Sequence, residues 1–419
     1  MRKLFSVLMI IFLLLMTACA YKTDTSGDGS SNDESITITL GFWDEAQANA
    51  YETVLKKFEE QNPNINVKLQ PTPWDQYWTK LETAASSSVL PDVFWMNGPN
   101  FNKYASNGIL LPLDKYLEKG KVDLNNYPQS LVELYTYEKT NYAIPKDFDT
   151  IALFYNKEMF DEAGVAYPDD TWDWNKVIEA AKKLTNKEEG TYGITATLNN
   201  QAGYYNTIYQ AGGYVLSEDE KESGYDDPNT IKGLKFWTDM IHKHKVSPTL
   251  AQMTDTKPQQ LFESEKVAMI YDGSWMAGVY HESLKEKVDV AVLPKGEKRA
   301  TVIHGVGHAI AANSKHPDEA WKLLEFLASE EANQMFSESG LFIPAYNGTQ
   351  EKWVEAIPEM NLQAFIDMLD YAVPYPANEN TPEWQKLEYD ILPKAWSGEE
   401  SIEKTAKKLD EEVEKVLEK

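Results

Sequence analysis

The chain of 419 residues contains a single cysteine, Cys19, and comparatively few basic residues. With one cysteine, an intramolecular disulfide cannot form, and a metal site built from several thiolates is excluded. There are 40 Lys and Arg residues against 66 Asp and Glu, which gives a formal net charge of −26. Such a charge repels nucleic acid and anionic membrane surfaces, so we expect neither as a ligand. A neutral solute fits this charge best.

Long apolar runs are also scarce, and the one that stands out lies at the N-terminus. Arg2 and Lys3 precede an almost unbroken apolar stretch at residues 4–16, and two small residues stand immediately before Cys19. This order of basic, apolar and small residues is typical of an export signal. The stretch is shorter than the ~20 residues that a membrane-spanning helix needs. We therefore predict a signal peptide at residues 1–18 and a function outside the cytoplasm.

The segment Met16–Cys19 resembles a bacterial lipobox, with Met in the place more often held by Leu. Cys19 would then become the first residue of the mature protein and carry diacylglyceryl and N-acyl chains, and more than one acyl chain anchors stably. The alternative is an ordinary signal peptide that is cut elsewhere. Residues 19–35 are polar and rich in Gly, Ser and Asp, which predicts a flexible tether. We expect a lipid-anchored protein on the extracellular or periplasmic side of the cell membrane.

Beyond the tether, strand and helix patterns alternate along the chain. Apolar residues at helical spacing predict a helix around Tyr51–Phe58 that ends before Pro63. Further helices are predicted at 74–88, 174–184, 231–242, 317–327 and 402–416, and strands at 36–43, 65–69, 93–96, 151–155, 267–270, 288–293 and 301–312. Strands separated by helices are typical of parallel pairing with right-handed crossovers. The pattern predicts an α/β protein.

Three short segments interrupt this alternation, at 145–150, 293–296 and 343–345. We interpret them as crossings between two lobes, with a hinge near residues 146–150. The N-terminal lobe would then comprise residues 36–146 and 297–344, and the C-terminal lobe residues 147–296 and 345–419. Two linked lobes with a cleft between them are what hinge closure on a ligand requires.

Several segments resemble the bacterial family 1 extracellular solute-binding proteins, the sugar-capturing subunits of ABC importers. The matching segments include LPDVFWMN at 90–97, YAIPKDFDTIALFYNKEMFDEAGV at 142–165, FESEKVAMIYDGSW at 262–275 and HGVGHAIAANSKHPDEAWKLLEFLASEEA at 304–332. They occur in the family's order over nearly the whole mature chain. One departure is Glu265, where the family commonly has Gly before the Lys, and we expect it to affect a turn. The resemblance implies a two-lobed periplasmic-binding-protein-like α/β fold, a ligand in the cleft, and no catalysis.

A carbohydrate presents C–H patches and a rim of hydroxyls, so its site needs aromatic faces beside charged or amide side chains. Open α/β sheets bind ligands at the ends of their strands. Strand ends and the positions that match the family together predict a ligand site made of Trp43, Asp44, Asn97, Asp147, Asp149, Tyr205, Asp272, Trp275, His304, Gly305 and Tyr375. By the resemblance, Trp275 would stack on the sugar from the second lobe, and the two aspartates would lie at the floor of the cleft.

The core-packing alternative stays open for the aromatic residues, and it is the default for Tyr204, Tyr205, Tyr371, Tyr375 and Trp384. His304 and His308 are four residues apart, but that spacing pairs metal ligands on a helix and this segment is predicted to be extended, so we expect no metal and no cofactor. Expected partners are a mono- or oligosaccharide and ABC permease subunits, and the many Trp and Tyr residues favour an oligosaccharide over a monosaccharide. The protein itself is expected to be a monomer. A polyamine or peptide receptor is a second hypothesis. A secreted glycoside hydrolase using Asp147 and Asp149 is a third, although no nucleophile elbow, H-E-x-x-H motif or phosphate loop is present.

Overall fold

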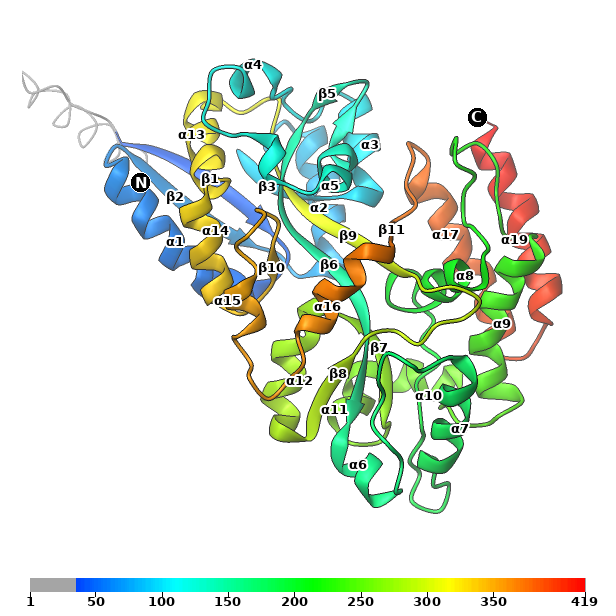
Figure 1. Cartoon of the computed structure of the whole chain (residues 1–419). Coiled ribbons are helices and arrows are strands. Elements are labelled where there is room, and N and C mark those ends of the chain that lie inside the picture. The colour runs from blue at the N-terminus through cyan, green and yellow to red at the C-terminus, as the bar shows by residue number, and fades with distance from the viewer. Residues whose placement is uncertain (1–34, 419) are drawn as a thin grey trace, which may run out of the picture. The chain divides into compact units, whose positions relative to one another are not determined.

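The structure is a computed structural model that describes residues 35–418. The predicted signal peptide, Cys19 and nearly all of the predicted tether lie outside these residues. In the described part of the chain, strands β1 to β11 and helices α1 to α19 follow one another in mixed order (Figure 1), which confirms the α/β prediction. None of the helices described is both long and apolar enough to cross a membrane.

The first three strands form a parallel group. β1 (Ile36–Phe42) lies between β2 (Ile65–Pro71) and β3 (Val93–Asn97) and pairs with both in parallel. The connecting helices α1 (Ala48–Gln61) and α2 (Trp74–Ser86) each bury one apolar stripe, which in α2 consists of Tyr77 and Leu81. Parallel pairing is therefore confirmed here, and the carboxyl ends of the three strands meet at one edge of the sheet.

The long strand β6 (Ala143–Asn156) belongs to two groups of strands, and all of its 14 residues are buried. Its first part pairs antiparallel with β9 (Thr301–Ile310), and β9 pairs antiparallel with β3. Its second part pairs antiparallel with β7 (Met269–Gly273) and β8 (Val288–Ala291). The predicted interruption at 145–150 is wrong, because a register shift between Pro145 and Asp147 accommodates the proline within one continuous strand.

The parallel order expected from the alternation does not extend to β7, which is antiparallel to β6. Six α-helices and a π-helical segment separate these two strands: α6 (Lys157–Glu162), α7 (Trp174–Leu184), η4 (Asn200–Tyr204), α8 (Tyr205–Ala211), α9 (Pro228–His242), α10 (Leu250–Asp255) and α11 (Pro258–Glu263). The rule for parallel crossovers applies to a strand, one crossover and a neighbouring strand. It does not constrain strand direction after so long an excursion.

The remaining elements cover these strands and return the chain to β6 and β9. The short strand β10 (Ile343–Pro344) pairs with β6, and β11 (Ala372–Pro374) pairs with β9. The other elements are α3 (Gly98–Ser106), α4 (Asp114–Leu117), α5 (Gln129–Leu134), β4 (Thr136–Tyr137), β5 (Thr140–Asn141), α12 (Ala277–Leu284), α13 (Pro317–Leu327), α14 (Glu330–Glu338), α15 (Glu351–Val354), α16 (Gln363–Asp367), α17 (Thr381–Ile391), α18 (Pro393–Trp396) and α19 (Ile402–Leu417).

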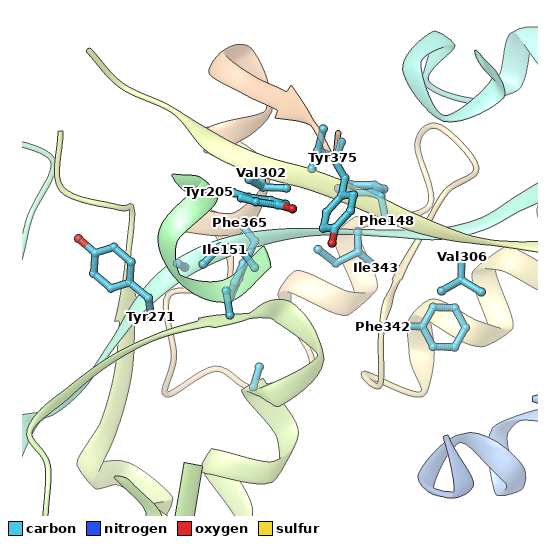
Figure 2. Close-up of a cluster of buried hydrophobic side chains, with 14 of the residues drawn as sticks. Phe148, Ile151, Tyr205, Tyr271, Val302, Val306, Phe342, Ile343, Phe365 and Tyr375 are labelled. Carbon is cyan, nitrogen blue, oxygen red and sulfur yellow. The ribbon is translucent and has the colours of Figure 1, made fainter. Parts of the chain in front are cut away.

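Hydrophobic packing holds β6 and β9 together where they run side by side. Figure 2 shows Phe148 and Ile151 from β6, Val302 and Val306 from β9, and Phe365 from α16 within one cluster of buried side chains. Each is at most 7% exposed. Burying a side chain of this size contributes roughly 1.5–3 kcal/mol, so the strands that bear the candidate site rest on a firm core.

The turn that follows α11 explains the departure from the family pattern. Glu265 has a φ of 57°, in the left-handed region where glycine is the usual residue. Its carboxylate accepts hydrogen bonds from Asn156 at 3.3 Å and from Lys287 at 3.0 Å. The expected effect on a turn is confirmed, and these contacts offset part of the cost of the backbone conformation.

Candidate ligand site at the sheet edge

The candidate residues of the first group of strands lie in a row across the sheet edge. The strand order is β6, β9, β3, β1, β2. β6 contributes Asp147 and Asp149, and β9 contributes His304 and Gly305. Asn97 ends β3 and pairs with Val306, and Trp43 and Asp44 follow the end of β1. Strand pairing therefore brings together residues as far apart in the chain as Trp43 and Gly305, which are separated by 305 − 43 = 262 positions.

The most buried charges in this row form an ion pair. Lys146 Nζ lies 2.5 Å from Asp147 Oδ2, and the lysine side chain is 1% exposed. The same ammonium lies 4.4 Å from the ring centre of Trp95 and 3.3 Å from that of Phe342. Burial lowers the pKa of Lys146 and raises that of Asp147, and the contact between the two opposes both shifts. The backbone N–H of Val306 donates to the other carboxylate oxygen at 2.8 Å.

The second aspartate, Asp149, is approached by polar side chains from two distant segments of the chain. Gln201 donates to Asp149 Oδ1 at 2.6 Å, and His304 Nδ1 lies 3.7 Å from Asp149 Oδ2. The backbone N–H of Gly98 donates to His304 Nε2 at 3.1 Å. The acceptor role of Nε2 leaves Nδ1 as the N–H of a neutral ring, so the ring directs its donor toward the carboxylate.

Glycine at position 305 allows β9 to approach β6 closely. A Cβ there would lie 2.5 Å from the backbone oxygen of Asp147 and 3.1 Å from Leu131 Cδ2. A larger residue at 305 would displace the segment that holds Asp147, and contact of Gly305 with a ligand stays a prediction.

Two polar members of the row also cap helices. Asn97 Oδ1 accepts from the backbone N–H of Asn100 at 3.3 Å at the start of α3. Asp44 accepts from Ala46 N at 3.0 Å and from Gln47 Nε2 at 2.9 Å. A carboxylate has about four acceptor positions, so Asp44 keeps capacity for a further donor. Asn97 is 5% exposed, which leaves it less accessible than the half-buried Asp44.

The second group of strands presents Trp275 just beyond the end of β7. Its side chain is 38% exposed, and its ring lies directly on Gly273, where a Cβ would be 2.0 Å from the indole. Asp272, three residues earlier, is 1% exposed. It accepts from Tyr280 at 2.8 Å, Gly273 N at 2.9 Å and Gln259 at 3.2 Å. Burial raises the pKa of Asp272 to about 6.

Asp272 therefore has its carboxylate engaged by protein groups, whereas the Trp275 ring is available to solvent. We expect Asp272 to affect ligand binding indirectly, by holding in place the turn that carries Trp275.

The rings of Tyr205 and Tyr375 lie side by side (Figure 2), and the Tyr375 ring also contacts His304. Their ring centres are 5.4 Å apart, and the ring of Tyr375 is 5.3 Å from that of His304. Tyr375 is 6% exposed, while Tyr205 is fully buried. Tyr205 donates to Glu388 Oε1 at 2.7 Å. Tyr204 and Trp384 are fully buried as well, so the packing alternative holds for both in this structure.

Three residues of this region did not stand out in the sequence. Lys146 lies next to the predicted Asp147, but its burial between two rings has no sequence signal. Gln201 reaches Asp149 from a π-helical segment far along the chain, again without a signal. Trp74 follows the end of β2 and is 50% exposed. The same rule of aromatic residues at strand ends that selected Trp43 would have found it.

Two grooves of the described chain are lined by none of these residues. One, of about 590 Å³, lies between α7 and α9 and is lined by Trp174, Asn175, Ile178, Glu179, Lys182, Pro228, Ile231, Lys232, Lys235, Phe236, Asp239, Lys243 and His244. Three of its lysines are paired with Asp239 or Glu297. The other, of about 400 Å³, lies near Lys121 and Glu325. Neither combines exposed aromatic faces with converging polar groups at strand ends, so we place the candidate site at the sheet edge.

The arrangement of strands and helices defines a class of two-lobed α/β solute-binding proteins. The structure superposes on the ABC substrate-binding protein of Listeria monocytogenes in complex with cycloalternan with a TM-score of 0.86 and 27% identity, covering 91% of this chain and 98% of that one. A solute-binding protein of Thermotoga lettingae bound to α-D-tagatose gives a TM-score of 0.81 at 27% identity, covering 92% and 100%. The two-lobed periplasmic-binding-protein fold is confirmed.

The sequence profile of the bacterial extracellular solute-binding proteins matches residues 43–334. This chain belongs to that family. Among curated relatives, the maltodextrin-binding protein MdxE of Bacillus subtilis is 24% identical over 412 residues, covering 96% of this chain and 92% of the relative. The multiple sugar-binding protein of Streptococcus mutans is 23% identical and covers 84% of each chain. The family consists of binding proteins rather than enzymes.

Proposed function

We propose that this protein captures a carbohydrate outside the cell and delivers it to the permease of an ABC importer. The observation that carries the proposal is the row of aromatic and hydrogen-bonding side chains at the sheet edge, from Asp149 through His304 to Trp43, with the exposed Trp275 on the second group of strands. Relatives named for maltodextrin and for multiple sugars support it, as do the cycloalternan and tagatose complexes of similar structures.

Each part of the row suits one property of a sugar. The apolar C–H face packs on an indole ring, whose π face carries partial negative charge. Sugar hydroxyls donate to the carboxylates of Asp44 and Asp149, and charge-assisted hydrogen bonds of this kind are the stronger ones. Because the polar groups of the site are held by neighbours, little conformational freedom remains to be lost on binding.

The Lys146–Asp147 pair argues against a polyamine as the solute. A polyamine would need the acidic side chains to be free, but Asp147 is already paired and the lysine would repel a second ammonium group. A neutral sugar has no such conflict. The same pairing removes Asp147 as a free partner of Asp149 in a hydrolase.

We infer that the two lobes close on the sugar about the segment at 146–150. The predicted lobes are residues 36–146 with 297–344, and residues 147–296 with 345–419. A ligand shifts such an equilibrium only by the difference in its affinity for the two forms. A sugar that touches Asp44 on one lobe and Trp275 on the other satisfies this condition. Closure would then report occupancy to the permease.

We further propose that Cys19 carries the lipid anchor after removal of residues 1–18, with residues 19–35 as the tether. The resemblance to a lipobox supports this. Anchoring would keep the receptor near the permease, which raises its effective concentration there. The monomeric state is part of the same proposal.

Isothermal titration tests the function directly, with matched panels of neutral sugars, polyamines and short peptides. We expect binding in the sugar panel alone. Trp275→Ala should weaken sugar binding by ~2 kcal/mol or more, about 30-fold, through loss of the stacking face. The control is Tyr167→Ala, which removes another exposed ring, one that is 40% exposed. Binding of a polyamine or peptide but no sugar would contradict the proposal, and an unchanged affinity in Trp275→Ala would remove that residue from the site.

A further inference from the structure

Glu388 on α17 is a fully buried carboxylic acid that lies outside the row of candidate ligand residues. In the described part of the chain, it forms no ion pair with a Lys, Arg or His side chain. Lys386 of the same helix pairs instead with Asp390 at the surface. A buried carboxylate without a cation is costly to ionise, and buried acids of this kind cluster at functional sites.

Three hydrogen-bond donors converge on the carboxylate of Glu388. Its Oε1 accepts from the hydroxyl of Tyr205 at 2.7 Å and from that of Tyr225, and its Oε2 accepts from Asn200 Nδ2 at 3.2 Å. A carboxylate only accepts, whereas a protonated carboxyl group needs an acceptor for its own O–H. The donors therefore suit the ionised form, while burial raises the pKa of Glu388 to about 7.

The other titratable groups that face Glu388 are tyrosines. They are Tyr204 of η4, Tyr205 and Tyr209 of α8, Tyr225 before α9, Tyr375 after β11 and Tyr389 of α17 itself. Burial and the nearby carboxylate raise the pKa of each above its ordinary value of 10. The tyrosines therefore keep their protons near neutral pH, and Glu388 is the member of this described cluster that changes its charge there.

Asn200 connects Glu388 to the candidate ligand site. Its Oδ1 accepts from the backbone N–H of Gln201 at 2.7 Å, and Gln201 Nε2 donates to Asp149 Oδ1 at 2.6 Å. The Asn200 amide thus turns its NH₂ group toward Glu388 and its oxygen toward Gln201. A proton on Oε2 of Glu388 would need the Asn200 oxygen as its acceptor, and the reversed amide would then direct its NH₂ group at the N–H of Gln201. Ionised Glu388 therefore favours the position in which Gln201 reaches Asp149.

A second set of contacts leads from the same cluster to the same aspartate. The ring centre of Tyr205 is 5.4 Å from that of Tyr375, and the Tyr375 ring is 5.3 Å from that of His304. His304 Nδ1 in turn lies 3.7 Å from Asp149 Oδ2. The two oxygens of Asp149 are thus approached by groups that both connect to the surroundings of Glu388.

We propose that Glu388 is a positioning residue of the ligand site, so that a sugar binds more tightly when the Glu388 carboxylate is ionised. The ionised carboxylate orients Asn200, and Asn200 holds Gln201 on Asp149. This inference rests on the proposed function. An acceptor that is already held in one orientation loses less conformational freedom on binding. Sugar affinity should then increase as the pH rises through the pKa of Glu388, and by linkage sugar binding should release protons near pH 7.

The test is titration calorimetry on the whole protein at pH 5.5 and at pH 8. The probes are glucose, galactose, maltotriose, lactose, cellobiose and xylobiose, and the sugar that binds most tightly at pH 8 is used throughout. We expect the affinity of the unchanged protein to be about tenfold higher at pH 8 than at pH 5.5. Asp272, whose pKa is raised to about 6, and His304 are present in every variant, so their effects cancel when variants are compared.

The variants separate positioning from a merely structural role. Glu388→Gln carries an NH₂ group in place of the acid O–H, so we expect its affinity to equal that of the unchanged protein at pH 5.5 and to lack the gain at pH 8. Gln201→Ala should lack the gain as well, and the double variant should lose nothing further, because both changes interrupt one connection. The control Asp390→Asn removes an exposed carboxylate of the same helix and should keep the full gain.

The outcomes distinguish this inference from the proposed function. If the unchanged protein binds none of the six sugars, the proposed function fails and this inference fails with it. If it binds one of them but Glu388→Gln or Gln201→Ala keeps the full gain with pH, this inference alone is wrong. A measurement on the unchanged protein needs no variant to fold: titrations at pH 7 in phosphate and in Tris, which differ in ionisation enthalpy, should show proton release on binding. No release, or proton uptake, would overturn the inference.

Discussion

Glu388 on α17 is fully buried, and its titration should be visible in the stability of the whole protein. Its carboxylate accepts hydrogen bonds from Tyr205 at 2.7 Å, from Asn200 at 3.2 Å and from Tyr225. Burial raises the pKa of Glu388 from 4.5 to about 7, and these hydrogen bonds oppose the shift. The cluster matters to the candidate site because Asn200 and Gln201 are neighbours, and Gln201 is the donor to Asp149.

The sign of the effect follows from the direction of the pKa change. A pKa that is higher in the folded protein means that folding favours the protonated acid. The stability contribution of Glu388 is therefore complete below pH 4.5 and is lost as the pH rises through about 7. At about 1.4 kcal/mol per pKa unit, the rise from 4.5 to about 7 corresponds to roughly 3 kcal/mol.

Glu388→Gln removes this titration and keeps the shape of the side chain. The free energy of unfolding of both proteins is measured by urea denaturation at pH 4 and at pH 8. We expect the difference, variant minus unchanged protein, to increase by roughly 3 kcal/mol from pH 4 to pH 8. Asp272, whose pKa is also raised, titrates in both proteins and cancels in the difference. Glu411→Gln, at an exposed position of α19, controls for the loss of one carboxylate. A difference that is the same at every pH would refute the reasoning.

Three further outcomes test other parts of the molecule. Gly305→Ala places a Cβ 2.5 Å from the backbone oxygen of Asp147. We expect the free energy of unfolding, measured by urea denaturation, to fall by about 1–3 kcal/mol and sugar binding to weaken. Unchanged stability and unchanged binding would mean that β6 and β9 separate at little cost. Saturating sugar should reduce the radius of gyration in small-angle scattering through closure about residues 146–150, whereas superimposable curves would indicate a rigid receptor or a site within one lobe. Cys19→Ser should release the protein from the membrane fraction or leave the precursor uncleaved, and normal processing with membrane retention would exclude the lipid anchor.

The features that the sequence determined by itself are those set by local periodicity and by family motifs. The apolar stripe of α1 and that of α19 follow directly from residue spacing, because a helix forms from contacts within a few positions. The parallel group of β1, β2 and β3 follows from short strand–helix–strand units. The family, and with it the two-lobed fold, followed from motifs that occur in order along the chain.

The tertiary structure alone decided which distant residues meet. β6 and β9 pair across more than 150 positions, and the continuous course of β6 through Pro145 depends on that pairing. The burial of Lys146, the hydrogen bond from Gln201 to Asp149 and the exposure of Trp74 arise in the same way. Residue patterns report which face of an element is apolar. They do not report what packs against that face, and it is this packing that separates an exposed stacking ring from a buried one.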